Sequence, residues 1–138
     1  MRLSIIATAI LAALSLPARP APAQEPVHRI LLAKDGGRHL EQGSIRGYDD
    51  VRYQVSTDAA GVLRIELKRV VGSNLFNVYG PGTQPGKDEA LFKGASEGTR
   101  AEVPVSKPGD YLVQVFLMRN AARRGTTSRY TLSVELTK

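Results

Sequence analysis

The residues best suited to chemistry in this chain are the four arginines of residues 119–129, Arg119, Arg123, Arg124 and Arg129, in a stretch that contains no acidic residue. A guanidinium can pair with a carboxylate through two parallel hydrogen bonds in a fixed geometry, so these residues offer recognition of an acidic partner. The alternative interpretation is a loop that stays solvated or that protects a sheet edge from aggregation.

Tyr48 is a second candidate, because it lies between Gly47 and Asp49 in an expected turn. An aromatic side chain in such a place either binds a partner or packs as a corner tyrosine on the end of the fold. The residues alone favour packing.

Residues 94–98 read Gly-Ala-Ser-Glu-Gly, the G-x-S-x-G pattern of a hydrolase nucleophile. That motif needs a strand before it, a helix after it and a histidine further along the chain. Both histidines, His28 and His39, precede it. We therefore treat the pattern as a coincidence.

No metal or acid–base site is predicted. The two histidines stand eleven residues apart, with no cysteine or carboxylate at ligand spacing. The acidic pairs at 49–50 and 88–89 are adjacent in sequence, so they would point to opposite faces of a strand or lie solvated in a turn. We predict a protein that is not an enzyme and that uses no cofactor.

Short β-strands must position the arginines and Tyr48. Residues 62–70 alternate apolar and charged side chains, as expected of a strand with one wet face. Pro104 marks an edge strand, because proline cannot donate to a central ladder. Residues 83–99 are expected to form a long loop, and residues 119–129 a presented loop. The expected strands cover residues 27–33, 39–45, 51–56, 62–70, 75–79, 100–105, 111–118 and 130–137. Seven or eight such strands without a helical period indicate an all-β, antiparallel β-sandwich.

The chain opens with a basic residue, an apolar run over residues 3–16 and an alanine-rich stretch, which predicts a signal peptide over residues 1–23. The run is too short to span a membrane. Residues 24–138 are then expected to form a single β-sandwich domain. The chain has no cysteine, so this domain must hold together through its core.

Loss of the signal peptide leaves 17 basic residues against 13 acidic ones, a net charge of +4. The four arginines of residues 119–129 equal that excess. A basic character confined to one site argues against a general nucleic-acid binder and favours an acidic partner patch.

Several segments together resemble the periplasmic inhibitors of g-type (goose-type) lysozyme. They are Gly-Ser-Ile-Arg-Gly-Tyr-Asp at 43–49, Tyr-Gly-Pro-Gly at 79–82, Gly-Asp-Tyr at 109–111 and Arg-Asn-Ala-Ala-Arg at 119–123. A broader similarity is to the β-sandwich modules at the C-terminal ends of secreted peptidases, which lack the arginine motif.

The resemblance implies a periplasmic inhibitor that places loop side chains in the acidic substrate cleft of a lysozyme. The lysozyme-binding residues it implies are Tyr48, Arg119, Asn120, Arg123 and Arg124. If so, Tyr48 and Arg119 must meet at one end of the sandwich. The alternative is a non-catalytic envelope module that binds an anionic glycan or another protein.

Overall fold

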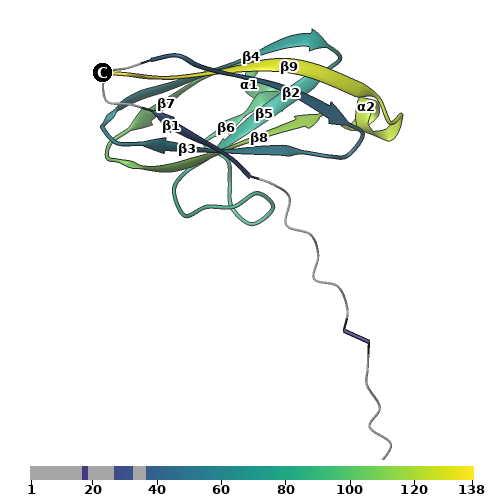
Figure 1. Cartoon of the computed structure of the whole chain (residues 1–138), viewed down its shortest axis with the longest axis horizontal. Coiled ribbons are helices and arrows are strands. Elements are labelled where there is room, and N and C mark those ends of the chain that lie inside the picture. The colour runs from purple at the N-terminus through teal and green to yellow at the C-terminus, as the bar shows by residue number, and fades with distance from the viewer. Residues whose placement is uncertain (1–16, 19–26, 33–36) are drawn as a thin grey trace, which may run out of the picture.

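A computed structural model describes residues 17–18, 27–32 and 37–138 of the chain (Figure 1). The predicted signal peptide, apart from residues 17–18, lies outside the described residues, and so does the segment 33–36 that follows the first strand. No helix among the described residues is long and apolar enough to cross a membrane.

The described strands form two stacked sheets, which confirms the predicted β-sandwich (Figure 1). One sheet has the order β1-β3-β8-β5-β6, with β1 (Val27–Leu32), β3 (Val51–Thr57), β8 (Gly109–Leu117), β5 (Asn74–Tyr79) and β6 (Phe92–Lys93). The other has the order β2-β9-β4-β7, with β2 (His39–Arg46), β9 (Thr127–Thr137), β4 (Gly61–Val71) and β7 (Arg100–Val105).

Neighbouring strands pair antiparallel except for β1 and β3, which pair in parallel. The exception to the predicted antiparallel arrangement follows from the connection. The intervening strand β2 lies in the opposite sheet, so β3 re-enters the first sheet running in the same direction as β1.

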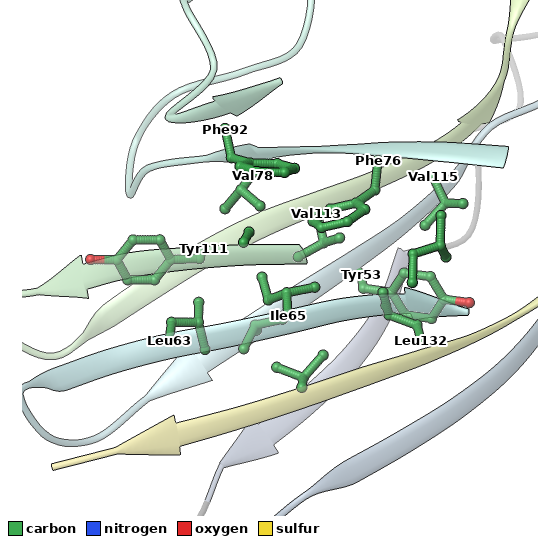
Figure 2. Close-up of a cluster of buried hydrophobic side chains, with 14 of the residues drawn as sticks. Tyr53, Leu63, Ile65, Phe76, Val78, Phe92, Tyr111, Val113, Val115 and Leu132 are labelled. Atoms are coloured by element: carbon green, nitrogen blue, oxygen red, sulfur yellow. The ribbon is translucent and has the colours of Figure 1, made fainter. Parts of the chain in front are cut away.

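Alternating side chains fill the space between the sheets (Figure 2). In β4, Leu63, Ile65 and Leu67 are buried, as predicted, and each such side chain contributes roughly 1.5–3 kcal/mol when it leaves water. Tyr53 and Tyr130 bridge the two sheets through a hydroxyl–hydroxyl hydrogen bond of 2.7 Å. Burial raises the pKa of Tyr53 and Tyr130 above the ordinary value, because both rings lie in the core.

The prediction of a long loop over residues 83–99 is wrong for the second half of that segment. This half contains β6 and the one-turn helix α1 (Gly94–Glu97). Phe92 stacks on Phe76 with ring centroids 4.9 Å apart (Figure 2). A side chain at Gly94 would collide with the carbonyl oxygen of Phe76, so glycine allows α1 to approach β5.

The predicted loop at residues 119–129 is also partly wrong. It begins with the short helix α2 (Arg119–Arg123), and β9 starts at Thr127, three residues earlier than expected. The prediction for Pro104 is confirmed, because β7 lies at the edge of its sheet.

Candidate functional site

Helix α2 presents the arginines because its alanines hold it against the core. Ala121 and Ala122 are buried, whereas Arg119 and Arg123 are exposed. Gly125 has a φ of 65° and its amide donates to the carbonyl of Ala122 at 3.0 Å, which ends the helix in the left-handed conformation that glycine favours. Arg119 and Arg123 are four residues apart, so they lie on the same side of this single turn.

Asn120 and Arg124, the other two predicted site residues on this segment, are also exposed. The side-chain oxygen of Asn120 accepts a hydrogen bond from the amide of Ala121 at 2.8 Å. That contact is local to α2.

Tyr48 lies in the turn between β2 and β3, and 74% of its surface is exposed. The alternative of a packed corner tyrosine is therefore wrong. The turn is tied to the segment after α2, because the amide of Gly47 donates to the carbonyl of Thr126 at 3.1 Å. Figure 1 shows α2 beside the end of β2, at the end of the sandwich opposite the C-terminus.

An open groove of about 600 Å³ joins the two predicted segments. Tyr48 and Arg119 both line it, so the structure places these two residues at the same end of the sandwich, as the resemblance implied. Its other lining residues are Gly47, Asp49, Asp50, Leu75, Asn77, Ala95, Gln114, Phe116, Leu117, Met118 and Ala122.

Two carboxylates line the groove, and one of them, Asp50, is largely satisfied by neighbouring side chains. Asp50 Oδ2 accepts hydrogen bonds from Arg52 Nε and Gln114 Nε2, both at 2.8 Å, and its side chain is 15% exposed. Asp49, the other carboxylate of the groove, is exposed, and Arg119 is the one cation among the described residues that line it.

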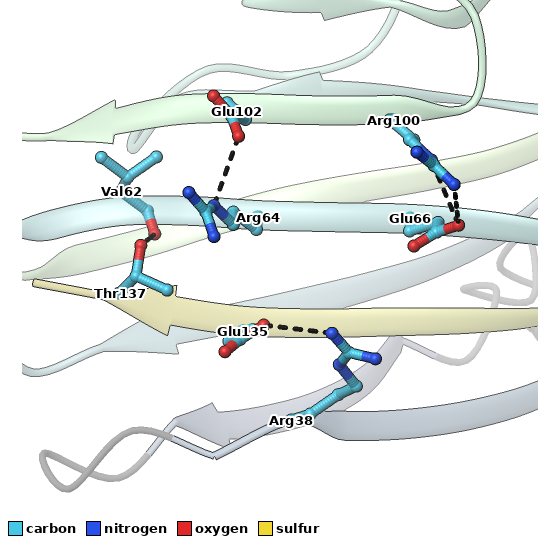
Figure 3. Close-up of polar contacts among 8 residues, drawn as sticks. All are labelled: Arg38, Val62, Arg64, Glu66, Arg100, Glu102, Glu135 and Thr137. Carbon is cyan, nitrogen blue, oxygen red and sulfur yellow. Dashed lines mark hydrogen bonds and ion pairs between the residues drawn. The ribbon is translucent and has the colours of Figure 1, made fainter.

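Six arginines near this end form no ion pair with any residue of the described part of the chain: Arg46, Arg69, Arg119, Arg123, Arg124 and Arg129. On the outer face of the four-stranded sheet the arrangement is different (Figure 3). There Arg38, Arg64 and Arg100 each pair with a glutamate at 3.1–3.6 Å.

The described residues form neither the expected context of a hydrolase nucleophile nor a metal-binding cluster. The G-x-S-x-G pattern occupies α1, a single turn after a two-residue strand, and Ser96 Oγ donates to the carbonyl of Lys93 at 3.3 Å. The described residues hold no group of three histidines, cysteines or carboxylates that could bind a metal ion.

The apolar side chains at this end were not among the predicted site residues. Leu75 and Phe116 line the groove, and Met118, Val70 and Val71 are exposed. The signal was present in the alternation of residues 111–118, because Phe116 and Met118 share a face with Gln114 rather than with the buried residues.

The chain is a two-sheet β-sandwich protein with an exposed cationic and aromatic surface at one end. It is structurally similar to the periplasmic inhibitors of g-type lysozyme, as its sequence predicted. The inhibitor PliG of Aeromonas hydrophila shares 28% identity, over 83% of this chain and 100% of that chain, with a TM-score of 0.69. A mutant of the PliG inhibitor from Escherichia coli shares 19% identity over the same fractions of the two chains, with a TM-score of 0.56.

A third similar structure is the pre-peptidase C-terminal domain of a collagenase from Bacillus anthracis. It shares 21% identity over 85% of this chain and 98% of that domain, with a TM-score of 0.56, so the likeness concerns the fold alone. No family model matches the chain, and no curated protein matches it closely enough to count as a relative.

Proposed function

We propose that this protein is a periplasmic inhibitor of g-type lysozyme that acts without catalysis and without a cofactor. The observation that carries the proposal is the meeting of Tyr48 and Arg119 on one groove, with Arg123 on the same turn of α2 as Arg119. The likeness to the Aeromonas inhibitor supports it independently. In this proposal residues 1–23 direct export and residues 24–138 are the mature domain.

The proposed mechanism is occupation of the acidic substrate cleft. Glycoside hydrolases cleave with a pair of carboxyl groups, and a guanidinium can engage a carboxylate bidentately. Arg119 and Arg123 would supply the guanidinium groups and Tyr48 the aromatic anchor, with Asn120 and Arg124 at the border of the contact. Truncation of a desolvated arginine or tyrosine anchor typically weakens binding by about 2–4 kcal/mol.

A lytic assay tests the proposal. Purified residues 24–138 are titrated against a g-type lysozyme acting on bacterial cell walls, with c-type and i-type lysozymes in parallel. We expect inhibition of the g-type enzyme that is complete near an equimolar ratio. Full lytic activity at a large excess of the protein would contradict the proposal.

The second candidate is an envelope module that binds an anionic glycan. It is favoured by the unpaired arginines at the α2 end and by the fold shared with the collagenase domain. It predicts that isolated cell-wall material retains the protein while lysozyme activity is unaffected. Sedimentation with purified cell walls, next to the lytic assay, separates the two candidates.

A further inference from the structure

The hairpin between β4 and β5 exposes two valines at the end of the sandwich that carries α2. Val70 is 57% exposed and Val71 is 47% exposed. The carbonyl of Val71 accepts a hydrogen bond from Ser128 Oγ, and the carbonyl of Ser73 accepts one from the amide of Met118 at 3.3 Å. The hairpin tip is therefore tied to both chain segments that flank α2.

The strand changes character where it reaches this end. Along β4 the residues on the wet face are charged, as at Arg64 and Lys68, but the strand finishes with two adjacent valines. The pairing with β9 shifts between Arg69 and Val71, so Val70 lies in an irregularity that has no partner in the ladder. Arg69 Nε donates to the carbonyl of Asn74 at 2.8 Å, which closes the hairpin beneath the valines.

Exposed apolar side chains gather at this end. Of the eight large apolar residues that are exposed among the described residues, four belong to the segments around α2: Tyr48, Val70, Val71 and Met118. Exposed valines at a strand end invite association with other chains, and the fold itself gains nothing from their exposure. Exposed apolar side chains concentrated at one end of a fold are typical of an interaction surface.

The mixture of side chains identifies the chemistry of the partner. Val71 is the cross-strand neighbour of Arg129, so apolar and cationic groups lie next to each other. A polyanionic glycan would neutralise the arginines but would leave the valines without a contact. A folded protein with an acidic cleft and an apolar border satisfies both, as in an interface with an apolar centre and a charged rim.

We propose that Val70 and Val71 form a second contact segment, the hairpin contact, which packs against apolar side chains bordering the lysozyme cleft that receives Arg119. This inference rests on the proposed function. The hairpin contact slows dissociation through apolar burial, whereas the arginines accelerate association through their charge.

The double variant V70T/V71T tests the hairpin contact. Threonine keeps the branched shape and the strand preference of valine but replaces one methyl group with a hydroxyl. Binding to a g-type lysozyme is followed by surface plasmon resonance at low and high salt. We expect affinity to fall about tenfold, all of it in the dissociation rate, with the association rate and its salt dependence unchanged.

The matched control is L31T, which removes an apolar side chain that is 79% exposed on β1, in the other sheet. It is expected to bind as the wild type does. All variants are also melted by circular dichroism, and if the double variant does not fold, V71T alone carries the test.

The outcomes separate the two claims. If V70T/V71T binds as tightly as the wild type while R119A binds weakly, the hairpin contact is overturned and the proposed function stands. If L31T loses as much affinity as the double variant, the hairpin contact is also overturned. If the wild type does not bind lysozyme at all, the proposed function fails, and the hairpin contact fails with it.

Discussion

Arginines on the outer face of the four-stranded sheet form ion pairs, whereas Arg119 and Arg123 at the α2 end form none with the described part of the chain. On the sheet, Arg64 Nε lies 3.3 Å from Glu102 and Arg100 lies 3.1 Å from Glu66, because the register of β4 and β7 sets each arginine opposite a glutamate (Figure 3). At the α2 end Arg119 and Arg123 have no ion-pair partner among the described residues.

Pairing, rather than charge alone, therefore distinguishes an arginine that is available to a partner. An arginine that already has a carboxylate must lose it before binding another. Arg119 carries no such cost, and Ala121 and Ala122 hold its helix in place. Four measurements can distinguish the α2 end from the outer face of the sheet.

The largest effect is expected from charge reversal at the α2 end. R119E places a carboxylate where the lysozyme cleft is acidic, so inhibition is expected to weaken at least about hundredfold. The matched variant R100E breaks the pair with Glu66 on the sheet and is expected to inhibit as the wild type does. Equal loss in both variants, measured as the inhibition constant, would contradict the division into two regions.

Removal of the aromatic anchor is expected to have the next largest effect. Y48A is expected to weaken inhibition about thirtyfold, or about 2 kcal/mol, because an exposed ring is buried on binding. L40A removes a side chain that is 60% exposed on β2 and serves as the control. If Y48A and L40A have the same inhibition constant as the wild type, Tyr48 is not an anchor.

The third measurement is the salt dependence of the association rate. Raising the ionic strength from about 50 mM to about 500 mM is expected to slow association with lysozyme about tenfold, because screening weakens steering by unpaired charges. R124A should reduce this salt dependence, and R64A should leave it unchanged. An association rate that does not respond to salt would exclude a steering role for the α2 end.

High pH is expected to lower the free energy of unfolding through the buried tyrosines of the core. The arginine–glutamate pairs on the sheet keep their charges. The pKa of Tyr53 and of Tyr130 is raised in the fold, so the stability they contribute is complete below pH 10 and is lost as the pH rises beyond it. Arginine and glutamate keep their charges over this range. Urea unfolding is expected to show a steeper loss between pH 9 and 11 in the wild type than in Y53F/Y130F. Identical pH profiles would contradict the role of the pair.

Much of the sandwich is predictable because alternation along a strand reflects burial directly. The faces of β4 and the edge position of Pro104 follow from local rules. Helix α2 does not, because five residues are too few to display a helical period. The segment around Phe92 and Gly94 is set by contacts with Phe76 of the preceding strand β5, which a local pattern within residues 83–99 cannot show.

The candidate site was predictable where a motif carried it. The arginines and Tyr48 stand out by type, and the resemblance required Tyr48 and Arg119 to meet. The valines of the β4–β5 hairpin could not be assigned in the same way, because a Val-Val pair at the end of a strand is equally typical of a buried segment. Val70 continues the wet face of β4, whereas Val71 follows the shift in pairing with β9.

Hydrogen–deuterium exchange of the protein, alone and in an equimolar mixture with a g-type lysozyme, shows directly whether the α2 end is the binding surface. We expect slower exchange on binding in residues 46–50, 70–73 and 117–126, and no change in β7. Protection confined to the outer face of the four-stranded sheet, or no protection anywhere, would contradict the assignment of the α2 end as the binding surface.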